Sequence, residues 1–187
     1  MGGLGGVIRN NNDSWIIGYQ KLTNVISNTH AELLALETGL KVALQLQLQP
    51  LEIETDSTEV ISLLDKEHQI FNHVISSCRW SMAQLGTPLL RHNFREANSV
   101  AHLLAKDSIK LQLMNKTIIH HAYTQLVEAA LKDDADGRLY GRIISEQTCN
   151  RLASMGNVNV VNSAGAFVNP LSFDPNGMTG KSPCNIT

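Results

Sequence analysis

The alternation of extended and helical hydrophobic patterns in the first 107 residues restricts this chain to a small set of folds. Two β-prone segments, residues 3–9 and 15–22, flank the turn-forming run at residues 10–13 and predict a hairpin. After the hairpin the predicted order is helix, strand, helix, helix, strand and helix. This order predicts an α/β fold: a mixed sheet, made of an antiparallel hairpin and parallel strands, flanked by helices.

Local signals place the boundaries of these elements. Helical spacing of apolar residues after Asn28 or Thr29, either of which can act as a cap, predicts a first helix that ends before Pro50. Residues 51–55 alternate apolar and polar side chains, which is typical of a strand. The further predicted elements are helices over residues 58–64, 71–85 and 97–106 and a strand over residues 88–94.

The second half of the chain gives weaker signals. Residues 109–131 and 138–152 have partly helical patterns. From Met155 onward Asn, Gly, Ser and Pro dominate, which predicts loop or disorder. We therefore expect two parts: a domain over residues 3–107 and an extension over residues 108–187 that is helical and then irregular, with a role that the sequence does not define.

Charge and hydropathy exclude several functional classes. The net charge is −2, and residues 1–107 contain 8 Lys and Arg against 11 Asp and Glu, so no general basic surface attracts nucleic acid. A nucleic-acid partner therefore needs a local basic patch or a bridging metal ion. The sequence shows no signal peptide and no apolar stretch of membrane-spanning length. We expect an intracellular protein that is neither secreted nor inserted in a membrane, in the nucleus or the cytoplasm.

Three segments contain polar residues that suit catalysis or binding. Glu32 lies early in the first predicted helix, where the helix dipole also stabilises an ordinary carboxylate. Asp56 follows a predicted strand, at the sheet edge where ligands bind in α/β folds, and a helix N-cap is its simpler interpretation. The third segment is predicted to be a strand, a polar turn and a helix, and it contains His92, Asn98 and His102.

In this order and at this spacing, the segments resemble the ribonuclease H family, especially its plant and retroelement-derived branch. That branch has the patterns AGxGxVLRDxxGxW, AELxAL followed by GL, ESDS, and HxxREANxxADxLAK. The matching stretches are residues 3–15, 31–40, 54–57 and 92–106. The resemblance implies a mixed sheet with strand order 3-2-1-4-5. It also implies binding of RNA–DNA hybrids and metal-dependent hydrolysis of their RNA strand.

The family holds two Mg²⁺ or Mn²⁺ ions with four carboxylates, because these hard ions prefer oxygen ligands. The resemblance implies that Glu32 and Asp56 are catalytic metal ligands, that His92 assists proton transfer or product release, and that Asn98 lies near the substrate. The last family carboxylate corresponds to His102, whose imidazole suits transition metals better than Mg²⁺. The first family aspartate has no counterpart after Met1. With two ligands of four, we expect hydrolysis to be weak or lost.

That missing aspartate belongs to a whole strand, the central one of the family sheet. Its absence leaves two buried rows of backbone groups unpaired, at a cost on the order of 1–3 kcal/mol for each group. Three outcomes are open: the chain is a truncated product, the neighbouring strands close up, or the tail of the chain fills the gap. The best β-forming stretch after residue 108 is Val158–Gly165, which is our candidate for a filling strand.

Two functions from different classes remain open. One is a nucleic-acid-binding, ribonuclease H-like domain whose activity is weak or lost, and Glu32, Asp56 and His92 favour it. The other is a non-catalytic interaction module that keeps only the fold, which His102 and the absent first aspartate favour. A truncated retroelement-derived product is a third interpretation. The sequence does not predict an oligomeric state.

Overall fold

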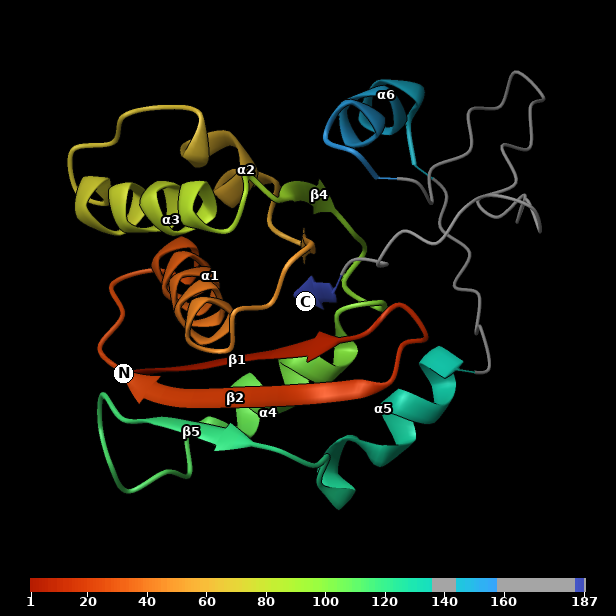
Figure 1. The fold of residues 1–187 in the computed structure, drawn as a ribbon. Helices are drawn as coiled ribbons and strands as arrows, with labels where there is room; N and C mark the ends of the chain where they lie inside the picture. Colours follow the sequence, from red (N-terminus) through yellow and green to blue (C-terminus); the bar gives the residue numbers. More distant parts are fainter. Residues whose placement is uncertain (136–143, 158–183, 187) are drawn as a thin grey trace.

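The computed structural model describes residues 1–135, 144–157 and 184–186 as a mixed α/β structure (Figure 1). Its strands are β1 Gly2–Arg9, β2 Trp15–Thr23, β3 Leu51–Thr55, β4 Leu89–His92, β5 Thr117–His120 and β6 Cys184–Ile186. Its helices are α1 Asn28–Gln45, α2 Thr58–Leu64, α3 Asn72–Gln84, α4 Ser99–Ser108, α5 Gln125–Ala135 and α6 Glu146–Ser154. None of these helices is long and apolar enough to cross a membrane.

The elements predicted for the first 107 residues are all present, in the predicted order. The hairpin of β1 and β2 is antiparallel and pairs Gly2 with Thr23. β3 and β4 are parallel and pair Glu52 with Leu89. An antiparallel hairpin and a parallel pair, flanked by helices, confirm the predicted fold class.

Serine side chains cap α1 and α2. Ser27, rather than Asn28 or Thr29, caps α1, because its hydroxyl accepts a hydrogen bond from the His30 N–H at 3.0 Å. Ser57 caps α2 in the same way and accepts from the Val60 N–H at 3.2 Å. Each hydroxyl satisfies a backbone donor that the first turn of a helix leaves without a partner.

Helices cover both faces of the sheet. α1, α2 and α3 pack on one face, where Leu33 and Ile75 are fully buried against Ile8 of β1. α4 and α5 pack on the other face, where Leu104 is buried against Val7. Adjacent residues of β1 thus point to opposite sides, as expected for a strand that is buried on both faces.

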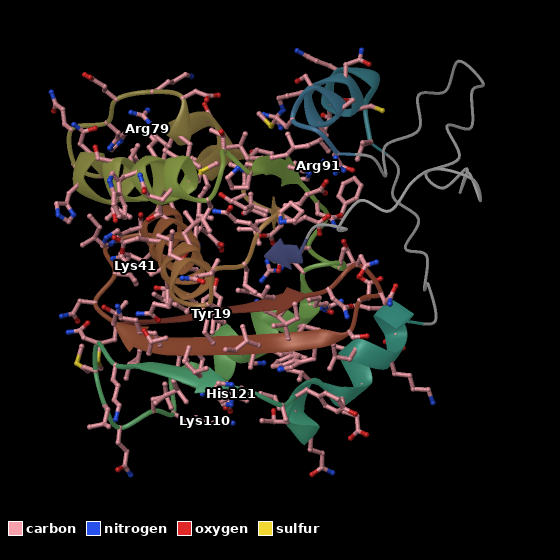
Figure 2. The ribbon with its side chains drawn as sticks, in the orientation of Figure 1. Tyr19, Lys41, Arg79, Arg91, Lys110 and His121 are labelled. Carbon is pink, nitrogen blue, oxygen red and sulfur yellow. The ribbon has the colours of Figure 1, made fainter. Side chains whose placement is uncertain are left out.

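Tyr19 fixes α1 against the sheet. It is buried between β2 and α1, and its hydroxyl donates to the backbone carbonyl of Ala35 at 3.0 Å (Figure 2). Across the hairpin Gly6 leaves room for the phenol ring, since a Cβ at this position would lie 2.1 Å from the Tyr19 oxygen. This contact determines the position of the helix that contains Glu32.

Two glycines allow α4 to approach β1 closely. A Cβ at Gly3 would lie 2.0 Å from the carbonyl oxygen of Ala105, and a Cβ at Gly5 would lie 2.3 Å from the Ala105 nitrogen and 2.7 Å from the Ala101 oxygen. These neighbours are backbone atoms of a helix, which cannot move aside as a flexible side chain can. Both positions therefore require glycine, and the close contact brings α4 beside the edge of β1.

The extension contributes β5, which the sequence analysis did not predict. β5 pairs antiparallel with β2, with His120 opposite Gly18, and lies at the edge of the sheet. The helical prediction for residues 109–131 is wrong at residues 117–120, where Thr117, Ile118 and Ile119 are β-branched and favour extended backbone. α5 and α6 overlap the stretches 109–131 and 138–152 for which helix was predicted, and each helix extends beyond the end of its stretch, to Ala135 and to Ser154.

β6 lies in the middle of the sheet, whose order is β4-β3-β6-β1-β2-β5. Ile186 pairs with Ile8 of β1 in antiparallel orientation and with Ile53 of β3 in parallel orientation. β6 therefore lies where the resemblance implies the central strand, between β1 and β3, which do not pair with each other. Loop or disorder was predicted here, and is wrong at residues 184–186 because the two flanking strands supply backbone partners. The candidate stretch Val158–Gly165 lies outside the described residues.

Substitution of Ile186 by proline tests the contribution of β6 to stability. Proline lacks the N–H that a central strand donates. Relative to Ile186→Val, which keeps the N–H, we expect Ile186→Pro to lower the free energy of unfolding by roughly 1–3 kcal/mol in urea titrations. Equal stability of the two variants would show that the sheet does not depend on β6.

Candidate functional site

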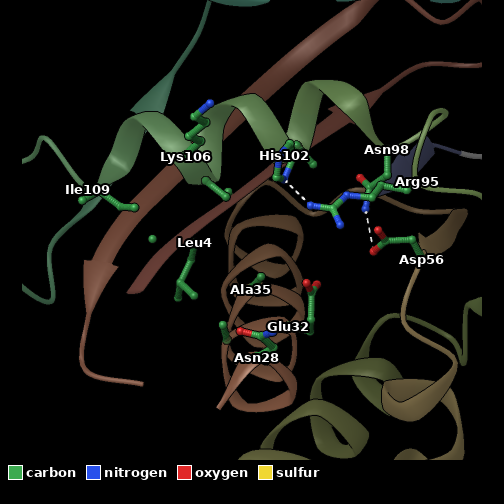
Figure 3. A pocket seen from close by; sticks show the side chains of 15 residues that line it. Leu4, Asn28, Glu32, Ala35, Asp56, Arg95, Asn98, His102, Lys106 and Ile109 are labelled. Atoms are coloured by element: carbon green, nitrogen blue, oxygen red, sulfur yellow. Dashed lines mark hydrogen bonds between the residues drawn. The ribbon is translucent and has the colours of Figure 1, made fainter. Parts of the chain in front are cut away.

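A cavity of about 370 Å³ lies between α1 and α4, beside the edge of β1 (Figure 3). Its polar lining consists of Asn28, Glu32, Asp56, Arg95, Asn98, His102 and Lys106. β6 pairs with β1 only at Ile8 and Arg9, and among the described residues no other strand pairs with that edge. Side chains of α1 and of α4, which pack on opposite faces of the sheet, meet beside this edge and line the cavity.

Glu32 reaches the cavity from the early part of α1. Ala31 and Ala35 line the same wall, and their small side chains leave space around the carboxyl group. Burial, and after it the negative charge of Asp56, raise the pKa of Glu32 from its ordinary value of 4.5 to about 7, while the positive charge of Arg95 acts to lower it. Glu32 is therefore partly protonated at neutral pH.

Asp56 faces the cavity from the carboxyl end of β3. Ser57, the next residue, caps α2, so the interpretation of Asp56 as the N-cap is wrong. Its Oδ1 instead accepts a hydrogen bond from Nδ2 of Asn98 at 3.3 Å. Asp56 is thus held by a contact across the cavity rather than by the helix that follows it.

The loop between β4 and α4 places Arg95 and Asn98. Asn93 anchors this loop to β3, because its N–H donates to the Thr55 carbonyl at 2.8 Å and its Nδ2 donates to Oε2 of Glu54 at 2.9 Å. The Asn98 N–H then donates to the Arg95 carbonyl at 3.1 Å, which closes a turn. Both side chains are thereby fixed relative to Asp56, which directly follows β3.

The guanidinium group of Arg95 extends into the cavity. Figure 3 shows it between His102 and Asp56, and its Nη2 lies 3.5 Å from Nδ1 of His102. An arginine only donates, so this contact requires Nδ1 to be the acceptor nitrogen of the imidazole. Sequence reasoning assigned no role to Arg95 or to Lys106. Both lie within the HxxREANxxADxLAK pattern, but only the folded structure shows that they line the cavity.

His92 lies outside the lining of this cavity. It is buried at the end of β4, where its N–H donates to the Met155 carbonyl at 2.8 Å and its Nδ1 lies 2.7 Å from Nδ2 of Asn157. Burial lowers the pKa of His92 overall, although the charge of Asp56 and a hydrogen bond with its backbone act to raise it. The structure therefore places His92 next to the Asp56 backbone, and Met155 and Asn157, which follow α6, cover it.

The predicted site residues are brought together only in part. Glu32, Asp56, Asn98 and His102 share the cavity, and His92 does not line it. No group of three or more His, Cys, Asp or Glu in the described ranges is arranged to hold a metal ion. Two divalent ions need more negative charge than two carboxylates supply, and here the cationic Arg95 occupies the same space. The residues therefore do not fit the two-ion centre that the resemblance implies.

A family model described as reverse transcriptase-like matches residues 1–108. The match covers more than half of the 187 residues. This chain belongs to the reverse transcriptase-like family. The match confirms the resemblance drawn from the sequence, because the matched part is a ribonuclease H-like domain of the retroelement-derived type. No curated protein and no solved structure matches the chain.

Replacing Glu32 by glutamine measures the cost of its buried carboxyl group. The folded state keeps the Glu32 proton up to a pKa of about 7, whereas the unfolded state loses it near 4.5. Stability therefore falls as the pH rises between these values. We expect Glu32→Gln to stabilise the protein by on the order of 1–3 kcal/mol at about pH 8 and to have little effect at about pH 4, as measured by urea unfolding.

Glu37 on the same helix provides the matched control. Burial acts to raise its pKa, but hydrogen bonds with Lys41 and Ser77 and the charge of Lys41 lower it overall. Its contribution to stability is present above the unfolded pKa and is lost on acidification. Glu37→Gln should thus destabilise at high pH, and the same pH profile for both variants would contradict the account of Glu32.

Proposed function

We propose that residues 1–108 form a nucleic-acid-binding domain of the ribonuclease H type, with the RNA–DNA hybrid as ligand and with hydrolysis weak or lost. The observation that supports this most directly is the composition of the cavity. By resemblance, Glu32 and Asp56 correspond to two metal ligands of the family and His102 to a third carboxylate; all three line the cavity, and His102 contacts Arg95. The cavity thus combines a reduced set of acidic ligands with groups that bind phosphate.

The cavity supplies the local basic patch that the overall charge of −2 lacks. Arg95 and Lys106 are exposed cations of its lining, and Asn28 and Asn98 add amide groups. Cationic side chains and amides are the usual partners of nucleic-acid phosphates and position the backbone without reading its sequence. We assign the sugar–phosphate backbone of the hybrid to this patch, with Asn98 nearest to the substrate strand.

We propose that the cavity binds Mg²⁺ or Mn²⁺ weakly at most. A single hard ion can use two carboxylates and several water molecules as ligands. Glu32 and Asp56 provide those two carboxylates, but Arg95 repels a second cation from the same space. We therefore propose weak binding of one ion and assign it no step in a reaction.

We also propose that the chain divides near residue 107, as the sequence predicts. Residues 3–107 supply the whole lining of the cavity except Ile109. The extension over residues 108–187 contributes β5 and β6 to the sheet and covers His92 with Met155 and Asn157. Its proposed role is to complete the structure around the binding domain.

The second candidate function is a non-catalytic interaction module. The burial of His92 against Asn157 favours it, because a histidine held in that way is withdrawn from proton transfer at the cavity. This candidate predicts a stable fold without affinity for nucleic acid. Binding of the hybrid therefore distinguishes the two functions, whereas the presence of the fold does not.

Lys106→Gln tests the assignment of the phosphate backbone. We expect the variant to bind a labelled RNA–DNA hybrid more weakly, as measured by fluorescence anisotropy. The plot of log affinity against log salt concentration should have a slope that is smaller in magnitude by about 1. The control is Lys132→Gln, which removes an exposed lysine of α5, outside the cavity. Equal losses for both variants would reject the cavity as the binding site.

Hydrolysis is tested separately with the same hybrid in Mg²⁺ and in Mn²⁺. The wild-type chain and the double variant Glu32→Gln, Asp56→Asn should both show cleavage at or near background, because two carboxylates do not assemble a two-ion centre. Metal-dependent cleavage by the wild type that the double variant abolishes would show that the reduced ligand set is still catalytic.

A further inference from the structure

Arg95 matches the arginine of the HxxREANxxADxLAK pattern, but the resemblance assigns it no role in the cavity. Its guanidinium lies between Asp56 and His102 and interacts electrostatically with Glu32 (Figure 3). The side chain is exposed, so an incoming ligand can reach it. The cavity therefore already contains a positive charge at the place where two carboxylates face each other.

We infer that Arg95 is a built-in cation that replaces a divalent metal ion in binding a phosphodiester, so that nucleic acid binds to this cavity without metal. The inference rests on the proposed function and deepens it. It concerns binding alone and assigns no bond cleavage to Arg95.

The contacts around Arg95 leave its charge available to a ligand. Nδ2 of Asn98 already hydrogen-bonds to Oδ1 of Asp56. In the described part of the chain, Arg95 forms no ion pair within 4.0 Å of either Asp56 or Glu32. Its polar neighbour at 3.5 Å is the imidazole of His102, which accepts without adding negative charge. An aspartate at position 102 would instead neutralise the guanidinium.

The chemistry of arginine matches a phosphodiester. A guanidinium is always charged and presents five N–H donors in a planar fork that binds two phosphate oxygens together. The carboxylates of Glu32 and Asp56 repel a phosphate, and a cation between them and the ligand offsets this repulsion. A divalent ion serves the same purpose by bridging carboxylate and phosphate oxygens. Arg95 supplies the charge without needing the missing ligands.

The test measures hybrid affinity by anisotropy in EDTA and in Mg²⁺ for the wild type, Arg95→Gln and Arg95→Lys. Wild-type affinity should change by less than about 2-fold between the two buffers, whereas Arg95→Gln should lose about 10-fold in EDTA and regain part of this in Mg²⁺. Arg95→Lys keeps the charge but lacks the planar fork of donors, so its affinity for the hybrid in EDTA should lie between those of the wild type and Arg95→Gln. Arg151→Gln, an exposed arginine of α6 outside the cavity, is the matched control.

Direct titration with Mn²⁺ gives a second measurement that does not use nucleic acid. Removal of the guanidinium leaves the carboxylate pair free, so Arg95→Gln should bind Mn²⁺ more tightly than the wild type does. Circular dichroism checks that each variant is folded, which is expected because the Arg95 side chain is exposed.

The outcomes separate this inference from the proposed function. Hybrid binding by the wild type only in Mg²⁺ would overturn the inference and leave the proposed function standing. Equal affinity of wild type and Arg95→Gln in EDTA would also overturn the role of Arg95. Absence of hybrid binding in both buffers would reject the proposed function and the inference together.

Discussion

The edges of β1 and β3 face each other in the middle of the sheet, and the rest of the structure depends on how their backbone groups are paired. Buried N–H and C=O groups require partners, so this gap must be filled or solvated. β6 fills it only beside Ile8 and Arg9 on one side and Leu51 to Ile53 on the other. The cavity lies along the remaining edge of β1, where Gly3 and Gly5 allow α4 to pack close by. The position of the candidate site is thus a consequence of how far the central strand extends.

The negative charges of the carboxyl groups in this cavity are offset by an arginine side chain rather than by metal ions. Glu32 and Asp56 line the same cavity, and burial together with the negative charge of Asp56 raises the pKa of Glu32. Arg95 opposes this repulsion from the loop before α4. His102 lies beside Arg95, at the position where the resemblance implies a carboxylate, and its imidazole adds no negative charge next to the guanidinium. Membership of the reverse transcriptase-like family therefore does not by itself predict a two-ion site in this chain.

The sequence predicted most of the fold of residues 1–108 because the signals there are local. Helical spacing, strand alternation and caps act over a few residues, and the errors there were shifts of one residue or two in the caps, to Ser27 for α1 and to Ser57 for α2. β5 and β6 were not predicted, since a three- or four-residue strand is determined by the distant edge with which it pairs. Among the site residues, Glu32, Asp56, Asn98 and His102 do share a cavity. The burial of His92 depends on Asn157, and the position of Arg95 depends on the loop before α4, which Asn93 anchors to β3. Neither arrangement follows from a local pattern.

The central claim is that this ribonuclease H-like cavity contains a carboxylate pair with its own cation and not a two-ion metal centre. Isothermal titration calorimetry with Mn²⁺, on the wild type and on Glu32→Gln and Asp56→Asn, tests it most directly. The account predicts at most about one ion per chain, with a dissociation constant of about 1 mM or weaker, because hard ions need more oxygen ligands than this pair provides. Two ions bound at micromolar concentration, and lost in both variants, would contradict it.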